Sequence, residues 1–239
     1  HPADVQGRFI RARRVVFALL IAFYVAAPLL SVGEHPAVHL DVDARHFYLF
    51  GRTFNAQDFW LVVPATLSFT FGLLFVTAWR GRVWCGWACP QTVFLEALYR
   101  PIERWLEGPR ERRLRAQNEP LTPGRAGRKA VKHMLYVVIS IVIAHVSLAL
   151  FVSAEQLRGM VLESPSAHPV PFAWAMALSA LFYFNFGWFR EQFCVVMCPY
   201  GRMQSVMHDR DSVLIAYDAK RGEPRGPLRK QAQPTTGDC

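Results

Sequence analysis

The chain has 239 residues, of which 52% are hydrophobic and only 19% are charged, and its formal net charge is +9. Soluble domains carry about 25% charged residues, so this composition argues against an ordinary soluble enzyme and favours a membrane protein. A basic excess also suits nucleic-acid binding, but here the basic residues flank apolar runs, where Lys and Arg anchor membrane helices. Nucleic acid is therefore not expected as a partner, and a lipid membrane is.

Four apolar segments along the chain are each long enough to cross a bilayer. A helix needs about 20 predominantly apolar residues to span the hydrocarbon core. Segments that meet this requirement lie at 15–31, 59–79, 134–152 and 170–188. We therefore predict an all-α integral membrane protein with four transmembrane helices. Asn185, a polar residue in the fourth segment, is expected to contact a neighbouring helix.

The basic residues are distributed unevenly between the loops. Of the 27 Lys and Arg residues, 24 lie before the first span, between the second and third, or after the fourth. Only 3 lie in the two remaining loops. Because basic loops stay on the cytoplasmic side, this asymmetry predicts that both ends of the chain and its middle loop are cytoplasmic.

These predictions divide the chain into four parts. An amphipathic pattern at 91–107 predicts a surface helix, and the Pro- and Gly-containing stretch after it, 108–130, is expected to be a loop or connector. A short strand is expected at 212–217. The four parts are a first helix pair with an extracytoplasmic loop (1–80), a cytoplasmic segment with the amphipathic helix (81–133), a second helix pair (134–188), and a cytoplasmic linker (189–239).

The pattern C-x3-C-P occurs twice, each time just after a predicted span, and it contains four of the five cysteines. On a helix, a spacing of four residues puts both thiols on one face. The proline that follows the second cysteine ends the local pattern, and the same ending closes the cysteine run of bacterial ferredoxins. We therefore predict a metal or iron–sulfur site at the cytoplasmic face, formed by Cys85, Cys89, Cys194 and Cys198.

The residues alone leave the occupant of this site open. Four thiolates suit a [4Fe–4S] or [2Fe–2S] cluster, a zinc ion or Cu(I). Nearby guanidinium groups are expected to lower the thiol pKa values and so to favour the thiolate; they belong to Arg80, Arg82, Arg190 and Arg202. The simpler alternative is that the cysteines are small buried apolar residues, which a repeated motif with a cluster-type ending disfavours.

The residues around both motifs resemble the cytochrome c oxidase accessory protein family known as CcoG, FixG or RdxA. The first stretch, 81–93, reads GRVWCGWACPQTV, and further similar strings are WFREQ, CPYGR, QSV and RGEPRG between residues 188 and 226. The chain ends on Gly-Asp-Cys, and in the family this cysteine, here Cys239, opens a ferredoxin-like domain. The resemblance therefore implies a chain that is truncated before that domain, with Cys239 as a cluster ligand.

The resemblance also implies a function. Family members lie in the bacterial inner membrane, carry [4Fe–4S] clusters, and support assembly of a cbb-type cytochrome oxidase together with its assembly factors. Their expected reaction is the reduction of Cu(II) to Cu(I), with copper as substrate or ligand and with electrons from a separate donor. Two alternatives stay open at this point. One is a quinol-linked electron-transfer protein of the polyferredoxin type, and the other is a non-enzymatic copper chaperone or assembly scaffold.

Overall fold

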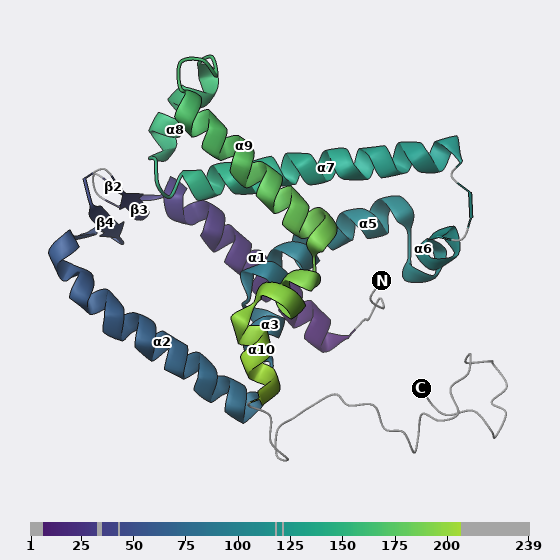
Figure 1. The fold of residues 1–239 in the computed structure, drawn as a ribbon, viewed down its shortest axis with the longest axis horizontal. Helices are drawn as coiled ribbons and strands as arrows, with labels where there is room; N and C mark the ends of the chain where they lie inside the picture. Colours follow the sequence, from purple (N-terminus) through teal and green to yellow (C-terminus); the bar gives the residue numbers. More distant parts are fainter. Residues whose placement is uncertain (1–6, 33–34, 43, 118, 121, 207–239) are drawn as a thin grey trace.

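A computed structural model describes residues 7–32, 35–42, 44–117, 119–120 and 122–206 of the chain. Long helices dominate it, and short strands lie at one end of them (Figure 1). The expected strand at 212–217 and Cys239 lie outside the described residues.

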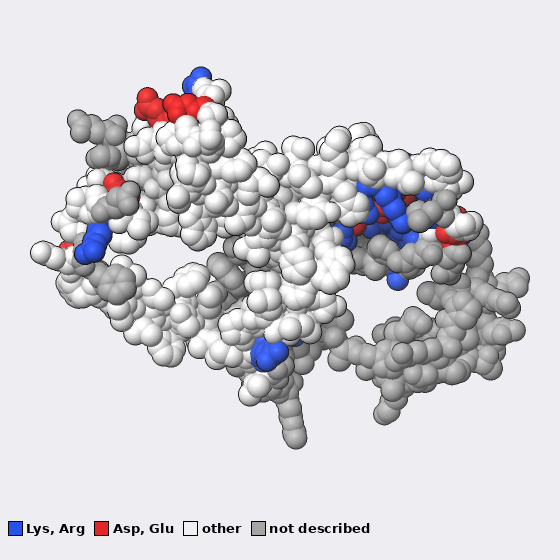
Figure 2. Space-filling model, turned by 45° about the horizontal axis from the view of Figure 1, so that its top comes forward, with Lys and Arg blue, Asp and Glu red and all other residues white. Residues whose placement is uncertain are grey.

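Among the described residues, four helical segments are long and apolar enough to cross a membrane. Most of their side chains face outward and are exposed, and Figure 2 shows a broad uncharged surface with charged groups gathered toward its ends. Such a surface is unfavourable in water and suits lipid. The prediction of four spans is therefore confirmed by length and composition. The spans are α1 (Arg8–Leu29), α2 (Phe59–Arg80), α7 (Pro123–Leu148), and α9 (Pro169–Tyr183) continued by the π-helix η3 (Phe184–Phe189).

The prediction of an all-α fold was wrong for the loop between α1 and α2. Phe47, Tyr48, Thr53 and Phe54 are residue types that favour strands, and tight turns with positive φ at Arg45 and Gly51 join the strands. The backbone amide of Leu40 donates to the carbonyl of Leu150 at 2.7 Å, which ties this sheet to the far end of α7. The loop forms an antiparallel pair, β1 (Ser31–Val32) and β2 (His35–Pro36), and an antiparallel sheet of β3 (Val38–Asp41), β4 (His46–Leu49) and β5 (Arg52–Phe54), followed by the 3-10 turn η1 (Ala56–Asp58).

The segment between α2 and α7 is more helical than expected. The predicted amphipathic helix is confirmed, but the expected connector at 108–130 contains a helix of its own and the first turns of α7. Proline is favoured in the first turn of a helix and glycine just past its end, so these residues mark helix boundaries here; Gly108, with φ +84°, ends one helix and Pro123 begins another. The helices are α3 (Val83–Trp87), α4 (Pro90–Phe94), the π-helix η2 (Leu95–Tyr99), α5 (Arg100–Glu107) and α6 (Arg110–Gln117).

The core of the molecule forms where η2 packs against α7 and η3. Tyr99 is fully buried, its ring stacks on Phe186 at 5.1 Å between centroids, and its hydroxyl lies 2.8 Å from the hydroxyl of Ser140. Burial of a large aromatic side chain contributes on the order of 2–3 kcal/mol. One face of the helix 90–107 therefore packs in the core, while Trp105 on the same helix is 79% exposed. This helix fixes the chain after the first cysteine motif against the chain before the second.

The remaining described helices lie at the two ends of the bundle. The helix α8 (Ala154–Leu162) connects α7 to α9, and the hydroxyl of Ser153 caps it by accepting from the amide of Gln156. The π-helix η4 (Phe193–Met197) and α10 (Pro199–Val206) follow η3 and carry the second motif. In Figure 1 α8 lies on the side of the strands, and α10 lies beside the carboxyl end of α2 on the opposite side.

Candidate metal centre

The first cysteine motif follows directly on the end of α2. Gly81, with φ +69°, ends that span, and Cys85 lies in the short helix α3. The amide of Cys89 donates at 3.0 Å to the carbonyl of Trp84, five residues earlier, so the last turn is widened. Cys89 itself is extended (φ −62°, ψ 124°), and Pro90 begins the next helix.

The second motif has the same backbone arrangement. The amide of Cys198 donates at 2.9 Å to the carbonyl of Phe193, again five residues earlier. Cys198 is extended (φ −73°, ψ 111°), and Pro199 begins α10. A residue before proline is pushed out of the helical region, and proline is favoured at the first helical position. The Cys-Pro pair therefore produces the same turn twice, with the second thiol outside the helix that carries the first.

Contacts between the two motifs bring them to one end of the bundle. The side-chain amide of Gln204, on α10, donates to Cys85 Sγ at 3.4 Å, and Gln204 is only 1% exposed. The hydroxyls of Tyr200 and Thr77 are hydrogen-bonded, which joins α10 to α2. Cys85, Cys89 and Cys198 are half-buried and Cys194 is exposed.

Cysteines of the two motifs lie close enough to affect the ionisation of Cys85 and Cys194. Burial raises the pKa of Cys85, and the nearby Cys89 and Cys198 raise it further. Burial also raises the pKa of Cys194, with smaller contributions of the same sign from the other three thiols. Like charges disfavour ionisation of a neighbour, so these effects indicate that the two motifs lie near each other.

The expectation that arginines lower the thiol pKa values does not hold for Cys85 and Cys194, whose pKa values are raised by burial. Arg82 lowers the pKa of Cys85, but its effect is smaller than that of burial, and the pKa of Cys85 is raised. The other arginines are engaged elsewhere. Arg80 stacks on Trp79 at 4.3 Å, Arg190 pairs with Glu103 at 2.6 Å, and Arg202 donates to the carbonyl of Val196 at 2.9 Å.

A pair of side-chain amides joins the chain after the first motif to the chain before the second. Gln91, the residue after Pro90, donates to Asn185 Oδ1 at 3.2 Å and accepts from Asn185 Nδ2 at 2.8 Å. The same amide of Gln91 also donates to the backbone carbonyl of Arg190 at 3.1 Å. The expected helix contact of Asn185 is therefore confirmed. We call these three residues the inter-motif contact.

A buried ion pair stabilises the inter-motif contact through Arg190. Glu103, only 3% exposed, accepts from Arg190 at 2.6 Å and from Arg113 at 3.0 Å. Burial opposes the charge of Glu103, but the hydrogen bond and charge of Arg190 outweigh it, so the pKa of Glu103 is lowered. Arg190 has a positive φ of 49°, which costs about 1–3 kcal/mol in a non-glycine residue. The ion pair offsets that cost and holds the chain in place just before Cys194.

Sequence reasoning found the four cysteines and Asn185 but missed the residues that position them. Burial of Glu103 was not expected from the amphipathic pattern, because a charged residue is almost never buried without a partner. Its partners are Arg113 in the next helix and Arg190, which is 87 residues away in the chain. Gln91 and Gln204 each follow a Cys-Pro pair within a few residues, and that proximity was the one signal available for them.

The donor set is suitable for a cluster. Within the described residues, no three His, Cys, Asp or Glu side chains lie close enough together to hold one metal ion. The pKa values of Cys85 and Cys194 nevertheless respond to cysteines of both motifs. Cysteine thiolates in sets of four hold iron–sulfur clusters. The residue types of the two motifs therefore suit a cluster.

Comparisons with known proteins match both motif regions. Residues 62–110 match the family model of a 4Fe-4S binding domain, and residues 189–237 match that of a 4Fe-4S dicluster domain. The nitrogen fixation protein FixG of Rhizobium meliloti is 34% identical over the whole chain, which covers 47% of FixG. Proteins RdxA and RdxB of Cereibacter sphaeroides are each 32% identical over the whole chain, which covers 51% of each. No solved structure matches the chain significantly.

Proposed function

We propose that this chain is part of a membrane iron–sulfur electron-transfer protein. It belongs to the family of FixG and RdxA, and it spans about half the length of these curated relatives. Cys85, Cys89, Cys194 and Cys198 would hold a cluster at the cytoplasmic face of a bacterial inner membrane. In the whole protein, the proposed reaction is reduction of Cu(II) to Cu(I). Its proposed purpose is assembly of a cbb-type cytochrome oxidase with that enzyme's assembly factors.

One observation carries the proposal. Two C-x3-C-P motifs more than 100 residues apart adopt the same backbone turn, and Gln204 of one region contacts Cys85 of the other. Each motif also lies in a region that matches a 4Fe-4S family model. Two equivalent turns that meet at one end of a helix bundle form a site of four thiols.

Copper fits this site as a substrate. A bound iron–sulfur cluster supplies electrons one at a time. Cu(II) would accept one electron and leave as Cu(I), and a separate electron donor would replace that electron. Because the four thiolates would be ligands of the cluster, copper would act here as an electron acceptor and not as a resident ion.

The proposed orientation follows from charge. The motifs, α5, α6 and the arginine-rich start of α1 lie toward one end of the helices, and the sheet and α8 lie toward the other. The first group carries most of the basic residues, which favours a cytoplasmic position.

The decisive experiment measures iron and acid-labile sulfide per chain after anaerobic purification of the segment and of the full-length protein. We expect both in the segment, with loss of the cluster in Cys85→Ser/Cys89→Ser and in Cys194→Ser/Cys198→Ser. Cys239→Ser is the matched control, because its proposed role belongs to a different domain. Iron-free wild-type segment would contradict the cluster assignment.

Copper reduction is tested separately on the full-length protein. The reduced protein is mixed with Cu(II) and a chromogenic chelator specific for Cu(I), and one Cu(I) per transferred electron is expected. The Cys85→Ser/Cys89→Ser variant should lose this activity. Cluster oxidation by quinone without any effect of copper would contradict the copper proposal and favour quinol-linked electron transfer, and copper binding without electron transfer would favour a chaperone.

A further inference from the structure

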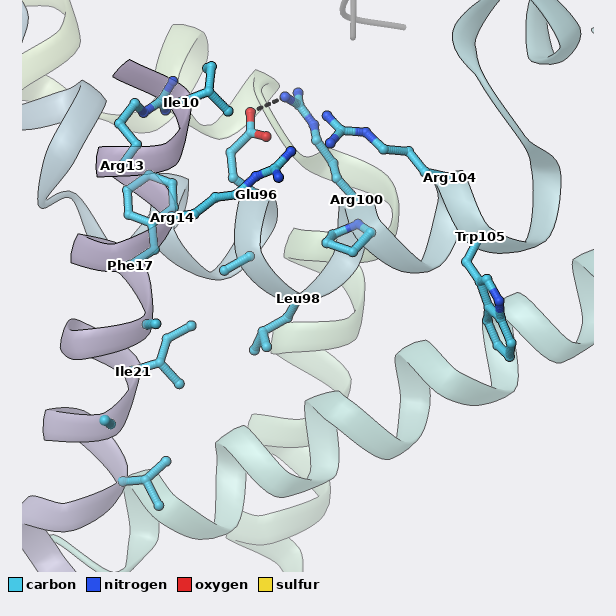
Figure 3. A pocket seen from close by; sticks show the side chains of 15 residues that line it. Ile10, Arg13, Arg14, Phe17, Ile21, Glu96, Leu98, Arg100, Arg104 and Trp105 are labelled. Carbon is cyan, nitrogen blue, oxygen red and sulfur yellow. Dashed lines mark hydrogen bonds and ion pairs between the residues drawn. The ribbon is translucent and has the colours of Figure 1, made fainter. Parts of the chain in front are cut away.

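A large groove lies between α1 and the helix 90–107, apart from the cysteines (Figure 3). Its volume is about 1160 Å³, and residues from Ile10 to Val25 form one wall while residues from Glu96 to Trp105 form the other. Both walls belong to elements at the basic end of the helices. The groove therefore begins at the expected membrane surface and continues along a spanning helix.

The two ends of the groove differ in polarity. Arginines from both walls surround its upper end in Figure 3, namely Arg13, Arg14, Arg100 and Arg104. Below them the walls are apolar, with Phe17 and Ile21 on α1 facing Leu98 across the groove. A site with a cationic mouth and an apolar interior matches an amphiphile with a negative headgroup.

Two of the charges at the mouth, those of Arg13 and Arg14, are not balanced by an ion pair within the described structure. The lining includes four arginines but one carboxylate, Glu96. Glu96 already pairs with Arg100, which also pairs with Glu191. For Arg13 and Arg14, no ion pair occurs within the described ranges of the chain.

Arg13 carries a further sign of a missing partner. Its Nε is buried and has no hydrogen-bond partner among the described residues. Its guanidinium lies over the ring of Phe17, 5.2 Å from the centroid, which holds it at the boundary between the cationic and apolar parts. A buried unpaired N–H costs about 1–3 kcal/mol, and an anionic oxygen at this position would remove that cost.

We propose that this groove binds an anionic phospholipid of the cytoplasmic leaflet. The phosphate accepts hydrogen bonds from Arg13 and Arg14, and an acyl chain lies against Phe17, Ile21 and Leu98. Basic pockets beside spanning helices on the cytoplasmic side are suited to anionic headgroups. A neutral quinone would leave the arginines uncompensated, and free phosphate would leave the apolar walls exposed. Charge complementarity therefore selects the lipid.

The test uses full-length protein in detergent and counts retained lipids by native mass spectrometry. The probes are phosphatidylglycerol, phosphatidylcholine, ubiquinone and inorganic phosphate. We expect one tightly retained phosphatidylglycerol and a loss of affinity of at least about tenfold in Arg13→Gln/Arg14→Gln, consistent with loss of charge-assisted bonds. The matched control is Arg8→Gln/Arg11→Gln, which removes the same charge from the same helix outside the groove and should retain the lipid.

Several results would overturn the proposal. They are equal losses in both double variants, equal binding of phosphatidylcholine and phosphatidylglycerol, displacement of the lipid by ubiquinone, or displacement by inorganic phosphate. A second variant, Ile21→Trp, fills the apolar part while leaving all four arginines in place, and it should expel the lipid if the acyl chain lies there. Retention of phosphatidylglycerol by this variant would also contradict the site. Because the readout is lipid retention, it is independent of iron content and copper reduction.

Discussion

The motif at 85–90 and the motif at 194–199 have the same turn but lie in different surroundings. Around the first, a Cβ on Gly86 would meet no atom within 4 Å, and both thiols are half-buried. Around the second, a Cβ on Gly201 would lie 2.6 Å from the carbonyl oxygen of Cys194, whose own side chain is exposed. The Cys-Pro sequence therefore determines the turn, and contacts from elsewhere in the chain determine where each thiol lies.

The second motif depends on support that the first does not need. It follows Arg190, whose positive φ is held by the buried pair with Glu103, whereas the first follows the ordinary end of a helix at Gly81. Glycine adopts positive φ without strain, but arginine does not. Variants that weaken this support should therefore displace the second motif and leave the first in place.

The largest expected effect is that of Glu103→Gln. It leaves Arg190 and Arg113 without a counter-charge in a buried position, and breaking a buried pair in this way costs about 3–5 kcal/mol. The measurement is the free energy of unfolding in detergent by denaturant titration. Glu119→Gln is the control, because Glu119 pairs with Arg125 at an exposed position and should cost at most about 1 kcal/mol. Equal losses of unfolding free energy in Glu103→Gln and Glu119→Gln would show that the buried ion pair gives the second motif no special support.

A smaller effect is expected from alanine at Gly86, inside the first motif, and at Gly201, two residues after the second. In Gly201→Ala the new Cβ collides with backbone at Cys194, and overpacking of this kind costs about 1–3 kcal/mol. In Gly86→Ala the space is open and the helix gains a better helix former, so stability should stay the same or rise slightly. Thermal unfolding midpoints of the two variants measure this contrast. A destabilising Gly86→Ala would show that the first motif is crowded too.

The inter-motif contact should show coupling of about 1 kcal/mol between its two amides. Asn185→Ala leaves the buried amide of Gln91 without this partner, and Gln91→Ala does the same to the half-buried amide of Asn185, so the double variant should lose less than the sum of the single ones. A double-mutant cycle on unfolding free energies measures the coupling. Additive losses would mean that the two residues act separately and do not link the motifs.

The smallest expected effect is a dependence on pH that is specific to the second motif. Burial alone would raise the pKa of Glu103, but the hydrogen bond and the charge of Arg190 outweigh it. The pKa of Glu103 is therefore lowered in the folded protein. Its contribution to stability is therefore fully present above the unfolded value of about 4.3 and is lost as pH falls through the lower folded pKa. Unfolding curves between neutral and strongly acidic pH should show this loss in the wild type. Glu103→Gln should lack that part of the dependence.

The sequence predicted the features that depend on local chemistry. Apolar length predicted the four spans, and proline predicted where each motif turns. It did not predict that Glu103 is buried, because its partner Arg190 is 87 residues away in the chain. Nor did it predict the strands between α1 and α2, whose pairing is set by turns at Arg45 and Gly51. The pKa values of Cys85 and Cys194 are raised where the expectation was a decrease, because burial outweighs the effect of nearby charge.

Three π-helical turns, η2, η3 and η4, surround the candidate site in the described structure. A π turn contains one more residue than an α turn, so each π turn shifts the side chains that follow it by one residue around the helix axis. Removing a single residue from η3 would restore ordinary α-helical phase and rotate everything after it by about 100°. Arg190 would then point away from Glu103, and Cys194 away from the first motif. The convergence of the two motifs therefore depends on the number of residues between them as much as on their identity.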